Sequence, residues 1–543
     1  MTIRPSRRLL EPVGVCLVAL ILACAMTYPV IARIGRVGRS DTADGRLSIW
    51  NVAWVARTLV VDPVHLFDAN IFFPHRGTLA YSENNFGAGV LALPAYWATG
   101  GNPYAALNVA LLLAFSLSFV GTYYLVRHLT DDRRAAVVSA ILFAFCPHVF
   151  AHTAHIQLLM TAGLPFSMLA FHRLADRPTA SRGAQLGLAM AAQAASCGYY
   201  GVFLLLIVGF AVIVVAVSGP WRRWAYWRAI AIGAVVAVLL VAPLFWPYLA
   251  LQRDTGFGRG IDDARRYSAD WRSYLASSAY AHSWMLKSLG RWNEVLFPGV
   301  LATGLGAAGV WLIRRRRSDL LVIYGGLTAL AFWTSFGPKA GLYTALYDVV
   351  PLFTWLRAPS RFGLVVAFGL SVLSGLGLAV LLPKNRRGSI LALVIAAVAV
   401  AELAQPFPVV SAPALSPAYN ILASMPRGPV IEMPFFFPEV GLFQHTIYML
   451  SSTSHWMPLV NGYSDYIPPD FRVHVETLKF FPSRDAFKLL QIDGARYAVL
   501  HMYRYNAANR ADVVGRLKEF EHYLRPLYVD DETRLYEIIG FPP

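Results

Sequence analysis

The chain has 543 residues, of which 57% are hydrophobic and only 14% charged, and its formal net charge is +16. A soluble domain usually carries about 25% charged residues, so this composition excludes an ordinary soluble protein and indicates a multispanning membrane protein. The basic residues form short clusters between apolar runs, as topology signals do, and no nucleic-acid motif accompanies them. We therefore expect membrane lipids around the chain and no nucleic-acid partner.

Apolar runs of about 17–25 residues are long enough to cross a bilayer as helices. Eleven such spans are predicted, at residues 12–32, 104–126, 135–151, 156–172, 183–199, 201–218, 229–248, 296–313, 319–336, 361–382 and 388–404. The run Phe86–Thr99 is shorter and contains Pro94. It is predicted to lie at the membrane interface or to enter the membrane only partway.

The Lys and Arg residues of the connecting segments predict the orientation of the spans. With a cytoplasmic N-terminus, each inner segment carries three or four Lys or Arg residues, whereas the short outer turns around 152–155 and 199–201 carry none. This bias is typical of inner loops. The outer side is then predicted to hold loops 33–103, 249–295 and 337–360, together with residues 405–543.

Residues 405–543 differ in pattern from the preceding chain. They begin with a proline-rich linker, and strand-like apolar runs follow at Val430–Met433 and Tyr497–Leu500. Helical patterns lie around Phe471–Phe480 and Asp512–Leu524. Mixed strands and helices predict a small α/β or α+β domain outside the membrane, beside a transmembrane module of residues 1–404.

The first outer loop contains two aspartates, Asp41 and Asp44, followed by apolar residues at nearly helical spacing. Trp50 and Trp54 lie one helical turn apart, and tryptophan prefers the membrane interface, so we predict an in-plane amphipathic helix. Asp44 is a candidate catalytic residue, because a carboxylate near a low-dielectric interface can have a raised pKa that suits proton abstraction. Alternatively, Asp44 caps the helix. Asp41 is either a substrate contact or a solvated loop acid.

Further candidates for substrate contacts lie on the predicted outer side, namely Glu83, His75, His152, His155 and Gln157. His152 and His155 could hold a metal ion, contact a polar or phosphate group of a substrate, or satisfy a helix end. No HExxH motif accompanies them. No metal ligand is therefore assigned, and a divalent cation stays an open alternative.

Two arginines, Arg357 and Arg361, lie at the outer entrance to a predicted span. A guanidinium group matches phosphate oxygens in a bidentate geometry, so this pair could bind a substrate phosphate. Alternatively, the two side chains lie among lipid head groups. The aromatic-rich stretch His455–Ser464 could be a sugar-binding surface or could pack against the membrane module.

Together these segments resemble the GT-C superfamily of integral membrane glycosyltransferases, and in particular a group of bacterial members. The matching segments are Asp44–Trp50, Phe67–His75, His152–Gln157 and Arg357–Phe362. The chain departs from the group's pattern at Ala43, where glycine is usual. It also has histidines in the turn 148–157, where many members carry a second acidic motif.

The resemblance implies an inverting hexosyl or pentosyl transferase at the outer face of the bacterial inner membrane. Such an enzyme moves a sugar from a polyprenyl-phosphate donor to a glycan, lipid or protein acceptor of the cell envelope. The resemblance also implies that Asp44 is the general base. Two alternatives stay open: a transporter or flippase of lipid-linked glycans, and a non-catalytic envelope assembly protein.

Overall fold

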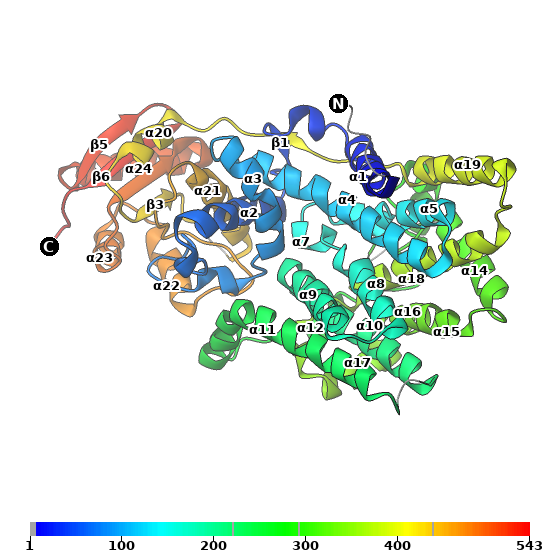
Figure 1. Cartoon of the computed structure of the whole chain (residues 1–543). Coiled ribbons are helices and arrows are strands. Elements are labelled where there is room, and N and C mark those ends of the chain that lie inside the picture. Colours follow the sequence, from blue (N-terminus) through cyan, green and yellow to red (C-terminus); the bar gives the residue numbers. More distant parts are fainter. Residues whose placement is uncertain (1–6, 220–221, 291–293, 437–438) are drawn as a thin grey trace, which may run out of the picture.

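A computed structural model describes residues 7–219, 222–290, 294–436 and 439–543 of the chain. The described chain up to Leu403 is mainly helical, whereas the main sheet lies beyond residue 429 (Figure 1). The helices of the first part are α1 (Arg7–Met26), α2 (Ala43–Val61), α3 (Phe86–Ala98), α4 (Pro103–Thr130), α5 (Arg133–Ala144), α6 (Pro147–Ala151), α7 (Ile156–Leu159), α8 (Gly163–Asp176), α9 (Ala180–Ser196), α10 (Gly198–Val217), α11 (Trp224–Thr255), α12 (Ile261–Arg266), α13 (Ser283–Leu289), α14 (Val300–Ile313), α15 (Ser318–Leu320), α16 (Gly326–Ser335), α17 (Leu342–Val349), α18 (Gly363–Leu381) and α19 (Arg386–Leu403).

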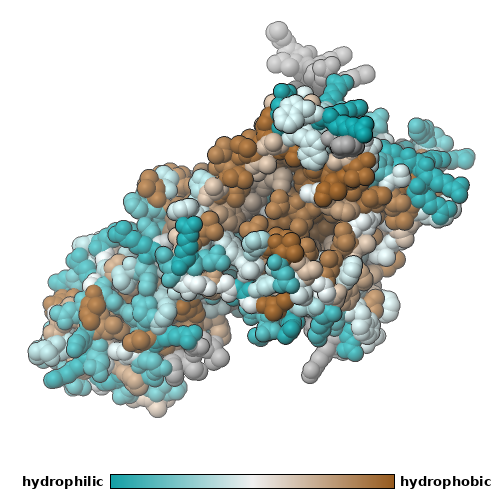
Figure 2. All heavy atoms as spheres, turned by 90° about the horizontal axis from the view of Figure 1, so that it is seen from below, coloured by the Kyte–Doolittle hydropathy of each residue, from teal (hydrophilic) through white to brown (hydrophobic). Residues whose placement is uncertain are grey.

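Six helical segments of the described chain are long and apolar enough to cross a membrane. They are Pro103–Thr130, Arg133–Ala151, Ile156–Asp176, Gly198–Val217, Trp224–Thr255 and Pro359–Leu381. Each coincides with one of the predicted spans, and the other five spans stay predictions. Hydrophobic residues gather over the helical part of the molecule, while the end that carries β5 and β6 is mostly hydrophilic (Figure 2). The protein is therefore a helical, multispanning membrane protein.

Helix α2 is buried inside the protein, which contradicts the predicted in-plane helix. Trp50 and Trp54 are only 1% and 5% exposed. The indole N–H of Trp50 donates to the side chain of Asn70 at 3.1 Å, and that of Trp54 donates to the carbonyl of Leu66 at 2.9 Å. The chain that follows α2 and the C-terminal region cover the two rings, so their polar edges bind protein rather than interfacial water.

The C-terminal region contains a four-stranded sheet in the order β3-β4-β6-β5. Strand β3 pairs parallel to β4, and the other neighbours are antiparallel. The elements are β3 (Val430–Met433), β4 (Tyr497–His501), β5 (Leu524–Val529), β6 (Thr533–Ile538), α20 (Pro417–Ser424), α21 (His445–Ser451), α22 (Pro469–Leu478), α23 (Arg484–Ile492) and α24 (Ala507–Glu519). Both predicted strands and both predicted helices are present.

Two short pairings join residues 33–103 to the C-terminal region. Strand β1 (Val37–Gly38) pairs with β2 (Val410–Ser411). Further along, the backbone N–H of Phe73 donates to the carbonyl of Leu459 at 2.8 Å, and that of Leu459 donates to the carbonyl of Asn70 at 2.9 Å. The segment Phe67–His75 therefore docks the C-terminal region beside α2.

Candidate active site

Asp44 lies in the first turn of α2, where its carboxylate meets His155. The hydroxyl of Thr42, not Asp44, caps this helix by accepting from the backbone N–H of Gly45 at 3.1 Å. The capping interpretation of Asp44 is therefore wrong. The Oδ2 atom of Asp44 lies 3.4 Å from Nε2 of His155, and the two side chains are 49% and 32% exposed. The carboxylate is thus fixed in direction yet open to a ligand.

The pKa of Asp44 is lowered rather than raised, so the predicted direction is wrong. Contact with the His155 imidazole lowers this pKa most, and the charges of Arg357 and Arg361 lower it further. Partial burial of the carboxyl raises the pKa but does not outweigh these contacts. Asp44 is consequently a carboxylate throughout the neutral range.

Arg357 and Arg361 approach Asp44 from the turn that precedes α18. At the start of α10, the hydroxyl of Tyr199 accepts from the backbone N–H groups of Arg357 and Ala358 and so fixes this turn. The guanidinium of Arg361 lies 4.3 Å from the centre of the Tyr199 ring, and that of Arg357 lies 5.6 Å from the centre of the Tyr267 ring. Cation–π contacts therefore orient both arginines within the protein, which favours the phosphate interpretation over the head-group one.

The charge of Arg361 acts on the pKa of two further carboxyl groups, Glu83 and Glu294. Burial raises the pKa of each carboxyl, and Arg361 opposes this rise in both. Glu83 accepts from the backbone N–H of Gly198 at 3.2 Å, and Glu294 lies 3.7 Å from the Nε2 atom of His152. Sequence reasoning predicted Glu83 but missed Glu294, which stands alone in a long loop without a motif.

The C-terminal region also reaches this site. The carboxylate of Asp465 lies 3.1 Å from Arg357 and 3.3 Å from Arg259. Burial raises the pKa of Tyr463, and the nearby charges of Asp44 and Asp465 raise it further. The preceding part of His455–Ser464 is buried packing, since Trp456 and Leu459 are only 6% and 0% exposed. Sequence reasoning missed Asp465 and Arg259.

The turn of residues 148–157, which carries three histidines, is stabilised by a side-chain contact to its own backbone. His152 contacts the carbonyl of His148 through Nδ1 at 2.8 Å, and burial lowers the pKa of His152 well below its usual value. Gln157 keeps a buried side-chain oxygen without a hydrogen-bond partner among the described residues. His155 thus lies beside Asp44, and His152, a weakly basic group, lies beside Glu294.

The other two predicted contacts, Asp41 and His75, are already paired with other side chains. Asp41 pairs with Arg39 at 3.0 Å, and Arg39 also donates to the hydroxyl of Thr153 at 2.8 Å. His75 contacts Asp470 of α22 at 2.9 Å. Within the ranges that the structure describes, no group of three or more His, Cys, Asp or Glu side chains is arranged to hold a metal ion.

No protein-family model matches this sequence, and no curated protein matches it. Solved structures do match the fold. The arabinofuranosyltransferase AftD from Mycobacteria superposes with a TM-score of 0.58 at 15% identity, over 99% of this chain and 40% of AftD. A mutant form of AftD gives a TM-score of 0.55, also at 15% identity, over 99% of this chain and 42% of that chain.

ArnT from Cupriavidus metallidurans matches with a TM-score of 0.50 at 15% identity, over 98% of both chains. This chain thus spans about two fifths of the length of AftD and nearly all of ArnT. At 15% identity, these matches are evidence of a shared fold and of nothing further. The chain has the fold of the GT-C membrane glycosyltransferases to which AftD and ArnT belong.

Proposed function

We propose that this protein is an inverting glycosyltransferase that moves a sugar from a polyprenyl-phosphate donor to a cell-envelope acceptor. The observation that carries this proposal is the meeting of Asp44 and His155 with Arg357 and Arg361, in a protein with the GT-C fold. A carboxylate and two cations on facing elements suit a reaction in which a hydroxyl loses a proton and a phosphate departs.

In the proposed reaction, the acceptor hydroxyl attacks the anomeric carbon of the donor sugar. The new carbon–oxygen bond forms as the bond to the phosphate oxygen breaks, and the configuration at the anomeric carbon inverts. The hydroxyl proton passes to the carboxylate of Asp44. Because the pKa of Asp44 is lowered, it takes the proton late, when the new bond has already made the hydroxyl acidic.

The leaving polyprenyl phosphate takes the electron pair and a negative charge. Arg357 and Arg361 are proposed to bind this phosphate, because guanidinium groups donate paired hydrogen bonds to phosphate oxygens. His155 holds the Asp44 carboxylate in place, while Glu83, His152 and Gln157 border the sugar. Asp41 and His75 are proposed to contact the acceptor from the edge of the site.

The proposal includes the orientation of the chain. The N-terminus is placed in the cytoplasm of a bacterium, and residues 405–543 form an extracytoplasmic domain over the reaction site. The contact between Arg357 and Asp465 supports this placement, because it puts the C-terminal region and the candidate active site at the same end of the helices.

The substitution Asp44→Asn tests the proposal. Purified protein in proteoliposomes is incubated with synthetic polyprenyl-phosphate pentoses and hexoses and a bacterial envelope extract, and released polyprenyl phosphate is measured. We expect the variant to lose at least about 100-fold in rate. The control Asp62→Asn, at the exposed far end of α2, should turn over like the parent. Full activity of Asp44→Asn would remove this carboxylate from the mechanism, and movement of donor across the bilayer without phosphate release would indicate a flippase.

A further inference from the structure

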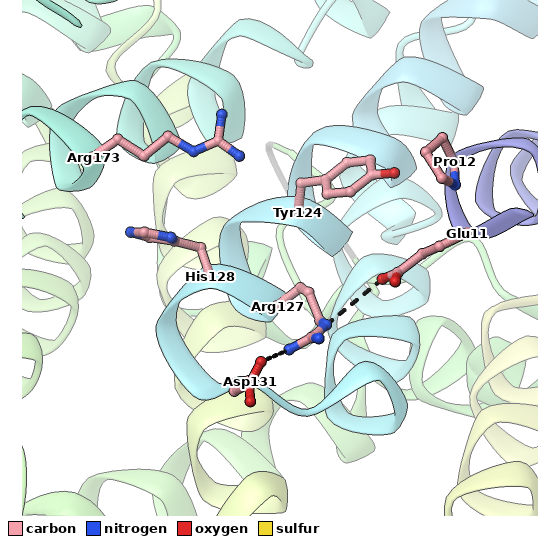
Figure 3. A pocket seen from close by; sticks show the side chains of 7 residues that line it. All are labelled: Glu11, Pro12, Tyr124, Arg127, His128, Asp131 and Arg173. Atoms are coloured by element: carbon pink, nitrogen blue, oxygen red, sulfur yellow. Dashed lines mark hydrogen bonds and ion pairs between the residues drawn. The ribbon is translucent and has the colours of Figure 1, made fainter. Parts of the chain in front are cut away.

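Two adjoining cavities lie at the arginine-rich end of the helix bundle, far from Asp44. The smaller, of about 420 Å³, lies between α1, α4 and α8 (Figure 3). The larger, of about 560 Å³, continues between α4, α8, α10 and the start of α15. His128 lines both cavities, so we treat them as one recess, the arginine recess, which carries Arg127, Arg173, Arg223 and Arg317.

Helix α4 separates this recess from the candidate active site. Near the start of the helix, Asn108 donates to the carbonyl of Val37 at 2.8 Å, in the loop that leads to Asp44. His128 lies at the other end of α4, roughly 30 Å further along the helix axis. A ligand in the recess therefore does not share the proposed transfer site.

The acids of the arginine recess already have partners, whereas two of its arginines do not. Arg127 is held between Glu11 and Asp131 (Figure 3). The other two acids are also paired, Asp176 with His128 at 3.1 Å and Asp319 with Arg317 at 3.4 Å. The formal charges of the four arginines and four acids thus balance, but the guanidinium groups of Arg173 and Arg223 have no acidic partner among the described residues and stay available to a ligand.

The wider surface at this end is also strongly basic. The segments concerned are residues 10–11, 127–134, 173–182, 222–228, 314–320 and 382–388, which contain sixteen Lys or Arg residues against five Asp or Glu. A surplus of one sign attracts and retains ligands of the opposite sign. The charge of the surface therefore selects an anion for the recess.

The exposed tryptophans near the recess and one wall of the recess indicate that this anion is attached to a lipid. Trp224, beside Arg223, is 76% exposed, and Trp311 is 61% exposed beneath the guanidinium of Arg314. Exposed tryptophans mark the level of lipid head groups. On α10, Val214 and Val215 line the larger cavity, while the neighbouring Ile213 and Val217 are 62% and 77% exposed. A polar head and an apolar tail can thus bind side by side.

We propose that the arginine recess binds the phosphate head group of an anionic phospholipid, with Arg173 and Arg223 as its ligands. Each guanidinium donates charge-assisted hydrogen bonds to the phosphate oxygens, and one acyl chain lies along the exposed face of α10. Basic recesses between membrane helices are a common form of lipid site. The site is independent of the proposed transfer reaction and requires no turnover.

Lipid binding by the purified full chain tests this site directly. Native mass spectrometry in a neutral detergent compares phosphatidylglycerol with phosphatidylcholine of the same acyl chains. We expect phosphatidylglycerol to bind more tightly, and the double substitution Arg173→Gln/Arg223→Gln to weaken it by at least about tenfold. Arg315→Gln/Arg316→Gln removes the same charge outside the recess and should change binding less than twofold.

A second variant separates the site from general attraction to charge. Ala175→Phe narrows the larger cavity and leaves every charge in place, and it should weaken phosphatidylglycerol binding by a similar factor. The site would be refuted if both double arginine variants lost phosphatidylglycerol binding equally. It would also be refuted if the parent bound phosphatidylglycerol and phosphatidylcholine equally. A thermal shift with inorganic phosphate that matches the shift with phosphatidylglycerol would instead assign the recess to free phosphate and overturn the lipid ligand.

Discussion

The guanidinium of Arg357 lies 3.1 Å from the carboxylate of Asp465, and so joins the helical part of the protein to its C-terminal region at the candidate active site. The same carboxylate lies 3.3 Å from Arg259. Two arginines from different loops thus share one acid, which fixes their directions while leaving their combined charge positive.

Removal of this shared acid is expected to disturb donor binding more than chemistry. In Asp465→Asn, Arg357 and Arg259 lose the group that orients them, so KM for the lipid-linked donor should rise by about 3- to 10-fold, with kcat changed less than twofold. Steady-state kinetics in proteoliposomes measure both constants. Asp512→Asn, which removes an exposed acid paired with Arg516, is the matched control. A fall in kcat at constant KM would contradict this role.

The acid limb of the pH profile should depend on His155. Because contact with His155 lowers the pKa of Asp44, the parent should keep its carboxylate charged to lower pH than an ordinary aspartate does. Activity is lost only as the pH falls through this lowered pKa. In His155→Gln, the contact that lowers the pKa of Asp44 most is absent. This pKa should therefore rise, and the acid limb should move to higher pH.

Profiles of kcat/KM against pH for the parent and for His155→Gln measure this shift. His65→Gln, which changes an exposed histidine paired with Asp62, should leave the limb where it is. An unchanged limb in His155→Gln would show that another group sets it.

Asn70 should matter for stability rather than for chemistry. Its amide accepts from Trp50 and donates to the hydroxyl of Ser452 and the carbonyl of Met457, all at about 3 Å. Asn70→Ala leaves these buried groups unpaired, which should cost about 3 kcal/mol of unfolding free energy. Thermal unfolding in detergent and proteolysis in the linker 405–416 report the loss. Asn509→Ala, at an exposed position, should unfold at the same temperature as the parent. An unchanged unfolding temperature in Asn70→Ala would show that the hydrogen bonds of Asn70 do not contribute to stability.

A second buried contact tests the C-terminal region by itself. The carboxylate of Glu432, which is fully buried, accepts from His501 at 2.6 Å and from the hydroxyl of Tyr419 at 2.7 Å. His501→Ala removes one hydrogen-bond partner of a buried carboxyl group, which typically costs about 1–3 kcal/mol. Chemical denaturation followed by tyrosine fluorescence measures this cost. The exposed His522→Ala should be neutral, and a comparable loss there would point to a nonspecific effect.

The sequence predicted individual residues of the site better than their surroundings. Asp44, His155, Arg357 and Arg361 each lie at the end of an apolar run, where composition alone marks a polar residue as unusual. The structure brings these four side chains together. Glu294 and Asp465 were missed because each lies in irregular chain, where only the tertiary fold decides which loops meet.

The two errors at α2 have different physical causes. Thr42 and Asp44 are both good capping residues, and only the exact start of the helix decides which of them caps it. Trp50 and Trp54 have the spacing of an interfacial pair, yet distant chain covers them. Local spacing carries no information about such cover, so the buried state of this helix could not be predicted.

The hydrogen bond from Arg46 to Thr446 spans 400 residues of sequence. A ribosome that adds roughly 5–20 residues per second needs roughly 20–80 seconds to make this stretch. During that interval the segment with Trp50, Trp54 and Asp44 has been made without the partners that later enclose it. Assembly of the candidate active site therefore waits for the end of translation, and premature termination yields a chain in which both tryptophans lack this cover.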